Sequence, residues 1–135
     1  MLIMAARSEH IYSVIKPALQ QGKIVICDRF IDSTAAYQAE TEDDIKRIFY
    51  LNDLVFDYFL PSITFYLKID PKLGIKRALD RGEINKFEMA EMNFHEKVSE
   101  NFDFLAKTFP SRIKTIDASK DSNQIFEEII EKINL

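Results

Sequence analysis

The sequence predicts an α/β fold with a parallel sheet, and three observations support this class. Extended apolar runs alternate with stretches of helical apolar spacing along the whole chain. One run, 24–27, holds four apolar residues in a row and ends at Asp28 and Arg29, which is typical of a strand buried on both faces of a parallel sheet. A second run, 63–69, is rich in β-branched and aromatic residues. We therefore expect strands over 23–27 and 63–69.

Size and composition indicate one domain. The 135 residues, of which 47% are hydrophobic, suffice for a single core and are too few for two, so we expect one domain over 1–135. No apolar run approaches the ~18–20 residues of a membrane span, and no signal peptide is recognisable at the start. We expect a cytoplasmic protein with no membrane partner. A net charge of -4 without a Lys/Arg cluster argues against binding to a nucleic-acid polymer.

The cysteine and the histidines predict no metal site. The single cysteine, Cys27, lies inside the first expected strand, where a buried thiol acting as a small hydrophobe is the usual case. His10 and His95 lack partners at metal-ligand spacing. We expect Cys27 to be a buried small hydrophobe and the two histidines to be surface or half-buried structural residues.

The amino-terminal part is expected to be one long helix. Residues 2–21 carry apolar side chains at helical spacing, and Gly22 ends the pattern. Pro17 is expected to kink this helix or to start its last segment. The apolar face is already established at Met1 with no N-cap residue before it, which predicts a chain cut in mid-domain.

The remaining elements continue the alternation. Helices are expected at 34–39, 42–59, 71–81 and 89–108 and from Asp121 onward, and a third strand is expected at 112–117. Pro61 marks the end of the second helix in this series, and Asp70 and Pro71 are the expected N-cap and first residue of the third. The helix at 89–108 is expected to have one apolar face, made of Val98, Phe102, Leu105 and Phe109. The last helix has one apolar stripe, made of Ile125, Phe126, Ile129, Ile130 and Ile133.

The first candidate site residues are Asp28 and Arg29. Both follow the strand at 23–27, at the edge where open α/β sheets bind their ligands. An arginine suits a phosphate there, because its planar fork donates two parallel charge-assisted hydrogen bonds. The alternative is a structural ion pair between the two side chains.

Three sequence blocks resemble those of thymidylate kinase, the enzyme that transfers a phosphoryl group from ATP to dTMP. Residues 24–38 read IVICDRFxxSTxAYQ, residues 5–11 read AARSEHI, and residues 81–88 read RGEINKFE. The resemblance covers essentially the whole chain but only about the carboxyl-terminal two-thirds of the family's length. Deoxynucleoside kinases, which carry a Glu-Arg-Ser block at the place of Asp28 and Arg29, are the nearest alternative.

The resemblance implies a P-loop NTPase-like three-layer fold with a parallel sheet in the strand order 2-3-1-4-5. None of the three glycines begins a GxxxxGK[ST] loop. We therefore expect the chain to lack the first two strands and the P-loop. The missing central strand is expected between the strands at 23–27 and 63–69, which leaves two exposed edges.

The resemblance also implies how the base of dTMP is bound. Arg7 is expected to reach the thymine carbonyl edge, and Ser33 or Thr34 to add a hydrogen bond to the base. Ile3 stands where the family has a phenylalanine that stacks on thymine, and it offers apolar contact without an aromatic face. The alternative for Arg7 is a solvated side chain without a ligand.

For the sugar and the phosphate, the resemblance implies four further residues. Tyr37 is expected against the 2′ carbon of the deoxyribose, which disfavours ribonucleotides, and Gln38 closes the same pocket. Arg29 is expected to hold the phosphoryl groups, with Asp28 orienting it or holding Mg²⁺ through water. A plain core aromatic is the alternative for Tyr37.

On the ATP side, the resemblance implies a lid over about 81–88, a mobile loop that closes over ATP. Arg77, Arg81 and Lys86 are the expected cations around the transferred phosphoryl group, because phosphoryl transfer depends on positioned positive charge. A solvated charged turn is the alternative for the lid. The segment Asp117-Ala118-Ser119 resembles the one that flanks adenine.

The expected function is therefore that of a thymidylate kinase homologue with dTMP and ATP as ligands, Mg²⁺ as the metal and a homodimer or other self-association. Without the P-loop, we expect the chain alone to be inactive. The alternatives are a non-catalytic nucleotide-binding or interaction remnant that pairs with another chain, and a gene fragment without an independent role.

Overall fold

Two parallel strands lie at the centre of the fold. The computed structural model describes residues 2–80 and 92–133. Strand β1 (Thr64–Lys68) pairs in parallel with β2 (Ile113–Asp117), and Thr64 lies opposite Ile113 while Lys68 lies opposite Asp117. Backbone hydrogen bonds from Thr64 to Arg112 and from Ala118 to Lys68 extend the ladder at its two ends. The predicted strands at 63–69 and 112–117 are confirmed to within one residue at each end.

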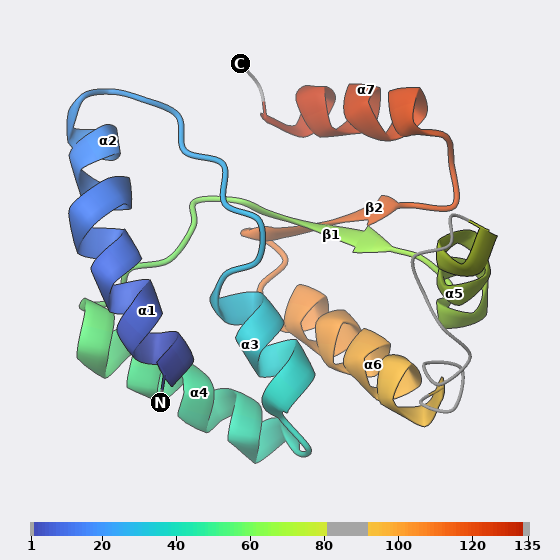
Figure 1. Ribbon diagram of the computed structural model, residues 1–135, viewed down its shortest axis with the longest axis horizontal. Helices are drawn as coiled ribbons and strands as arrows, with labels where there is room; N and C mark the ends of the chain where they lie inside the picture. Colours follow the sequence, from blue (N-terminus) through green and yellow to red (C-terminus); the bar gives the residue numbers. More distant parts are fainter. Residues whose placement is uncertain (1, 81–91, 134–135) are drawn as a thin grey trace.

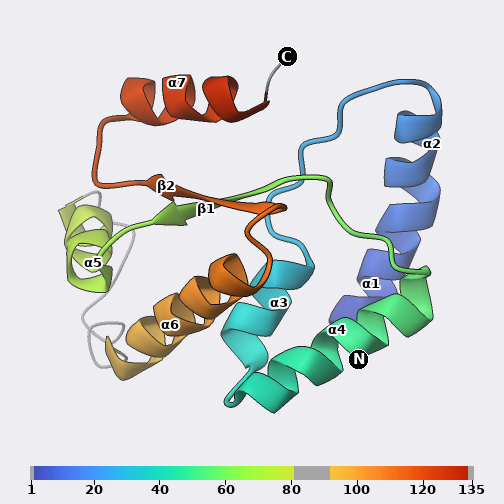
Figure 2. The ribbon, with the colours of Figure 1, turned by 180° about the vertical axis from the view of Figure 1, so that it is seen from behind.

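Helices cover both faces of this strand pair (Figure 1). Helix α7 lies along one face, and α6 and α3 lie on the other, with α4 beneath α3; Figure 2 shows the same layers from behind. The helices are α1 (Leu2–His10), α2 (Lys16–Gln20), α3 (Ile31–Gln38), α4 (Glu42–Phe56), α5 (Pro71–Asp80), α6 (Met92–Thr108) and α7 (Ser122–Ile133). The α/β class, the parallel sheet and the three layers are thus confirmed. No helix within the described ranges is long and apolar enough to cross a membrane.

The amino-terminal helix changes its winding before Pro17. A π-helical segment, Ile11–Ile15, joins α1 to α2, and the N–H of Lys16 donates to the carbonyl of Ile11 five residues earlier. Proline has no N–H to donate and its ring clashes with the carbonyl four residues before it, so the wider turn accommodates the residue. The prediction that Pro17 starts the last segment is confirmed.

The core lies between the sheet and the helices on its α3 side. Its fully buried side chains include Ile11 from the π-helical segment, Ile31 from α3, Phe56 from α4 and Leu105 from α6. The predicted apolar face of α6 is confirmed, because Val98 and Leu105 are buried, and Phe102 and Phe109 pack against the same cluster.

The prediction of a buried strand over 23–27 is wrong. The backbone there forms no strand, Ile24 and Ile26 are 73% and 95% exposed, and Cys27 is exposed rather than buried. A strand needs a neighbour to accept and donate its backbone hydrogen bonds, and no described segment pairs with this one. The apolar run therefore has the composition of a buried strand, but no described segment forms the backbone hydrogen bonds that a strand requires.

Several helix boundaries differ from those expected. Helix α3 starts at Ile31 rather than at 34, and α4 ends at Phe56 rather than at 59. Asp57 and Tyr58 adopt left-handed backbone conformations with φ of 54° and 58°, which terminate α4 before Pro61 is reached. The N-cap of α5 is confirmed, since the carboxylate of Asp70 accepts hydrogen bonds from the N–H groups of Lys72 and Leu73.

The apolar stripe of α7 is packed along only part of its width. Ile125 and Ile129 are half-buried, whereas Phe126 and Ile130 are 63% and 45% exposed. Helix α7 contacts β2, so a strand pair narrower than the expected sheet leaves the rest of the stripe uncovered.

Candidate functional site

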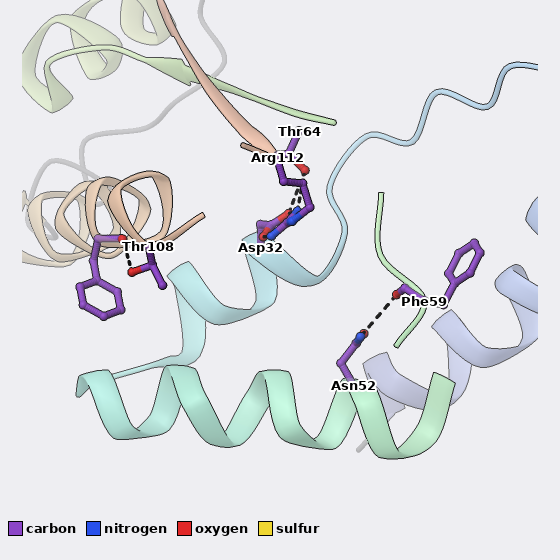
Figure 3. Close-up of polar contacts among 7 residues, drawn as sticks. Asp32, Asn52, Phe59, Thr64, Thr108 and Arg112 are labelled. Carbon is purple, nitrogen blue, oxygen red and sulfur yellow. Dashed lines mark hydrogen bonds and ion pairs between the residues drawn. The ribbon is translucent and has the colours of Figure 1, made fainter. Parts of the chain in front are cut away.

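Helix α3 carries four of the predicted ligand-binding residues, and a buried ion pair fixes its first turn. Arg112, directly before β2, donates to both carboxylate oxygens of Asp32 at 2.6 and 2.8 Å. The hydroxyl of Thr64 donates to Asp32 at 3.0 Å and accepts from Arg112 at 3.0 Å (Figure 3). The side chains of Arg112 and Asp32 are 12% and 4% exposed. The start of α3 is therefore tied to the first residues of both strands.

The other end of α3 is held by an amide from α6. The Nδ2 group of Asn101 donates to the carbonyls of Ala36 and Ala39 at 2.9 Å each. Asn101 is 5% exposed, so these bonds satisfy carbonyls that the end of a helix leaves without partners. Sequence reasoning missed Asp32, Arg112 and Asn101, because each is an ordinary polar residue until the fold brings its partner close.

The structure brings together the two residues predicted to bind the base. The Nη2 group of Arg7 on α1 donates to the hydroxyl of Thr34 on α3 at 2.6 Å. The same guanidinium lies 5.0 Å from the centre of the Phe30 ring, a cation–π contact. Burial lowers the pKa of Arg7, while the nearby Cys27 and Asp32 act in the opposite direction. The guanidinium is thus half-buried, charged and oriented, which is what recognition of a carbonyl edge requires.

The neighbouring predictions for the base lie on the same two helices. Ile3 on α1 is 51% exposed and stands one helical turn before Arg7, so the two side chains share a side of α1. Ser33 is half-buried next to Thr34. Their roles in binding a base stay predictions.

Asp28 and Arg29 do not form the structural ion pair that the sequence analysis left open as an alternative to ligand binding. Within the described residues, Arg29 makes no ion pair with Asp28, and its guanidinium lies 5.1 Å from the centre of the Tyr37 ring. Arg29 has a φ of 63°, an uncommon conformation for a residue with a side chain and one that is enriched at functional sites. Both Asp28 and Arg29 are exposed, so both are accessible to a ligand.

Tyr37 lies in an aromatic cluster between α3 and α6. Phe94 and Phe102 form T-shaped pairs with the Tyr37 ring at centroid distances of 5.9 and 6.4 Å. Phe102 also stacks on Tyr66 of β1 at 4.9 Å. Tyr37 itself is 38% exposed, so it is neither a plain core aromatic nor free in solvent. Gln38 beside it is exposed.

A second group of predicted residues meets at the carboxyl ends of the strands. Arg77 on α5 donates to the carbonyls of Ala118 at 2.8 Å and Ser119 at 2.6 Å. Asp117 accepts from both the N–H and the hydroxyl of Ser119, which lowers the pKa of the Asp117 carboxyl. The turn after β2 is therefore rigidly shaped by Arg77, whose guanidinium serves the backbone here rather than a phosphate.

An open cavity of about 420 Å³ lies beside this turn. It is lined by Lys68, Ile69, Asp70, Leu73, Thr115, Asp117, Ser119 and Glu128. Mixed apolar and polar walls at the carboxyl edge of a parallel sheet are typical of a site for a small organic ligand. The predicted cations Arg81 and Lys86, and the lid over about 81–88, lie outside the described residues.

The carboxylates of the described ranges suit Mg²⁺ only in combination with a nucleotide. No group of three His, Cys, Asp or Glu side chains there is placed to hold a metal ion. In nucleotide sites, however, Mg²⁺ commonly takes one or two carboxylates and completes its shell with phosphates and water. The exposed carboxylate of Asp28 fits such a role, which stays a prediction.

This arrangement defines an α/β protein whose candidate ligand residues are presented by helices packed on a parallel sheet. A family profile described as thymidylate kinase matches residues 1–129, so the chain belongs to the thymidylate kinase family. The thymidylate kinase of Anoxybacillus flavithermus is 39% identical over 132 residues, which are 96% of this chain and 63% of that protein. That of Rickettsia africae is 44% identical over 131 residues, again 96% of this chain and 64% of the relative.

A solved structure gives the same result. The crystal structure of thymidylate kinase from Ehrlichia chaffeensis superimposes on this chain with a TM-score of 0.70 at 37% identity. The matched region covers 96% of this chain and 59% of the Ehrlichia chain. The chain therefore spans about three-fifths of the length of these relatives. The family resemblance expected from the three sequence blocks is confirmed.

Proposed function

We propose that this chain forms the dTMP-binding part of a thymidylate kinase, whose reaction transfers a phosphoryl group from ATP to dTMP. The observation that carries the proposal is the hydrogen bond between Arg7 and Thr34. Two side chains 27 positions apart, both expected at the base, meet at 2.6 Å on adjoining helices. The family membership and the charge of the half-buried guanidinium support the same assignment.

The chemistry of this site favours thymine over cytosine. The guanidinium of Arg7 can only donate hydrogen bonds, so it pairs with the carbonyl at position 4 of thymine and not with the amino group of cytosine. Thr34, which can donate and accept, and Ser33 add polar contacts, and Ile3 adds an apolar one. Tyr37 and Gln38 would then lie along the sugar.

Arg29 is the proposed phosphate ligand. Its guanidinium is exposed and rests on the ring of Tyr37, so it can turn to a phosphate without breaking an ion pair with Asp28. Asp28 would orient the arginine or meet Mg²⁺ through water. Mg²⁺ would supply charge neutralisation of the phosphates during transfer.

For ATP, the proposed contacts are the turn Asp117-Ala118-Ser119 for adenine and the cations Arg81 and Lys86 for the phosphates. The bonds from Arg77 to Ala118 and Ser119 support a positioning role for Arg77 at the adenine end. The printed sequence contains no GxxxxGK[ST] motif, so we propose that this chain by itself does not turn over dTMP and ATP above background.

A second candidate function is an interaction role, and the segment 23–27 favours it. This segment is extended, apolar and exposed, and β1 pairs on only one side within the described residues. Such edges recruit strands from other chains, so a homodimer or another self-associated form is the proposed state. The cytoplasm is the proposed compartment.

Calorimetric titration tests the main proposal. The wild-type chain is titrated with dTMP and with dCMP, and the same is done for Arg7→Ala and for Arg47→Ala, an exposed arginine on α4. We expect dTMP to bind more tightly than dCMP, Arg7→Ala to remove that preference, and Arg47→Ala to keep it. Absence of any dTMP binding by the wild-type chain contradicts the proposal.

A further inference from the structure

The ring of Tyr37 is held from three sides by side chains with different burial. Arg29 covers one face of the ring at 5.1 Å. From α6, Phe94 and Phe102 make T-shaped contacts with it at interplanar angles of 66° and 84°. Phe94 and Phe102 are eight residues apart and therefore lie along the same stripe of the helix.

The two phenylalanines differ in what else they contact. Phe102 is half-buried, stacks on Tyr66 at 4.9 Å with the planes 16° apart, and packs against the core. Phe94 is 42% exposed, and among the described residues its ring also makes a T-shaped contact with its neighbour His95. Core packing therefore accounts for Phe102, whereas Phe94 lies at the exposed side of the aromatic cluster and contacts the ring of Tyr37.

The contact between Arg29 and Tyr37 is lost if the guanidinium of Arg29 turns to bind a phosphate. A guanidinium that turns to a phosphate leaves the face of the tyrosine ring, so the cation–π contact no longer holds the ring in the nucleotide-bound state. The T-shaped contacts from α6 then determine where the ring lies. This makes Phe94 more important with nucleotide bound than in the free chain.

We propose that Phe94 is a positioning residue that sets the place of the Tyr37 ring and, through it, the discrimination against nucleotides that carry a 2′-hydroxyl. The inference rests on the proposed function, in which Tyr37 lies against the sugar. A tyrosine held close to the 2′ carbon leaves no room and no hydrogen-bond partner for a hydroxyl there. Without Phe94, the ring can retreat toward the space that Phe94 fills, and the hydroxyl is admitted.

The test compares the affinities of the chain for dTMP and for 5-methyluridine 5′-monophosphate, which differ only at the 2′ position. Both are titrated into the wild type, Phe94→Leu, Phe94→Ala and the control Phe126→Ala, which removes a phenylalanine that is 63% exposed on α7. We expect the preference of the wild type for dTMP to fall by roughly threefold to tenfold in the two Phe94 variants. The control should keep the wild-type preference.

A second readout follows the ring itself. In a sample with isotope-labelled tyrosine and phenylalanine, the nuclear Overhauser contacts between the rings of Tyr37 and Phe102 should weaken in Phe94→Leu and stay unchanged in Phe126→Ala. A general loss of stability lowers both affinities together and leaves their ratio unchanged, so the ratio separates positioning from folding. Phe94→Leu decides the matter if the alanine variant does not fold.

The outcomes separate the two proposals. An unchanged ratio in Phe94→Leu, with dTMP still preferred by the wild type, overturns the role of Phe94 and leaves the proposed function standing. A wild-type chain that binds neither nucleotide overturns the proposed function and this inference with it. An altered ratio together with weakened contacts between Tyr37 and Phe102 supports both.

Discussion

Asp32 and Arg112, 80 positions apart in the sequence, form a buried two-bond ion pair that joins the start of α3 to the start of β2. Helix α3 presents Thr34 to Arg7 and Tyr37 to Arg29. The geometry of the candidate site thus depends on a contact that lies outside it. Thr64 completes the network from β1 (Figure 3).

Removing one member of this pair should destabilise the chain strongly. Arg112→Met leaves the carboxylate of Asp32 buried without its cation, and breaking a buried pair in this way costs about 3–5 kcal/mol. Lys46→Met, which breaks an exposed pair with Asp43, should cause no measurable change. Urea denaturation followed by circular dichroism measures both. Equal urea midpoints for Arg112→Met and the wild type contradict the assigned role. The double variant Asp32→Leu with Arg112→Met should recover part of the lost stability, because it removes the unpaired buried carboxylate.

The capping box of α4 gives a prediction about pH. The side chain and backbone of Thr41 donate hydrogen bonds to Asp44 and lower the pKa of its carboxyl. A carboxyl with a depressed folded-state pKa stabilises the fold above its unfolded pKa of about 4, and this stability is lost as the pH falls through the folded value. Asp44→Ala should therefore be less stable than the wild type at pH 7, with the difference closing below about pH 4.

Thermal denaturation at a series of pH values measures this dependence. Glu96→Ala, at an exposed site on α6, is the control and should follow the wild-type curve. A difference between Asp44→Ala and the wild type that persists undiminished at about pH 2 assigns the effect to the uncharged side chain and its hydrogen bonds to Thr41, and not to the ionised carboxylate, because helix propensity alone favours alanine.

The elements with their own partners in this chain could be predicted from the sequence. The apolar face of α6 and the N-cap at Asp70 follow from the local sequence pattern, and both are found. The strands β1 and β2 are also found, because each has the other as its hydrogen-bonding neighbour. The segment 23–27 has the composition of a buried strand, but composition does not supply a neighbouring strand, so its side chains Ile24 and Ile26 are exposed.

The site could be predicted only as a set of residue types. The sequence blocks indicated Arg7 and Thr34 separately, and the fold supplied their hydrogen bond. The supports of the site could not be inferred, because Arg112 and Asn101 act on α3 from 80 and more than 60 positions away. Long-range pairs of single polar residues leave no periodic signal in the sequence.

If Arg29 holds the phosphate of dTMP, its removal should weaken binding markedly. Loss of a charge-assisted bidentate contact costs roughly 2–4 kcal/mol, which is about 30-fold to 1000-fold in the dissociation constant. Calorimetry with Arg29→Ala measures this, and Arg47→Ala, whose side chain is 79% exposed, is the matched loss of one positive charge. Equal dTMP affinities for Arg29→Ala and the wild type show that Arg29 serves the structure alone.

Self-association of the chain should depend on its exposed apolar segment. Ile26 is 95% exposed in an extended stretch, and β1 has an edge with no partner in the described ranges, so pairing between copies buries apolar surface and satisfies backbone groups. We expect light scattering over a dilution series to show dimers or larger species for the wild type. Ile26→Lys should shift the population to the monomer, because a charge on an extended edge opposes pairing.

A second apolar surface provides the comparison for this prediction. Val14, in the π-helical segment, is 53% exposed on the amino-terminal helix, which therefore offers a second exposed apolar surface for contact between copies. Val14→Lys should leave association through the segment 23–27 intact and should reduce only association through the helix. If Val14→Lys dissociates the species and Ile26→Lys does not, the helix is the interface. A monomer at every wild-type concentration, with one cooperative thermal transition, shows that the chain needs no partner for either surface.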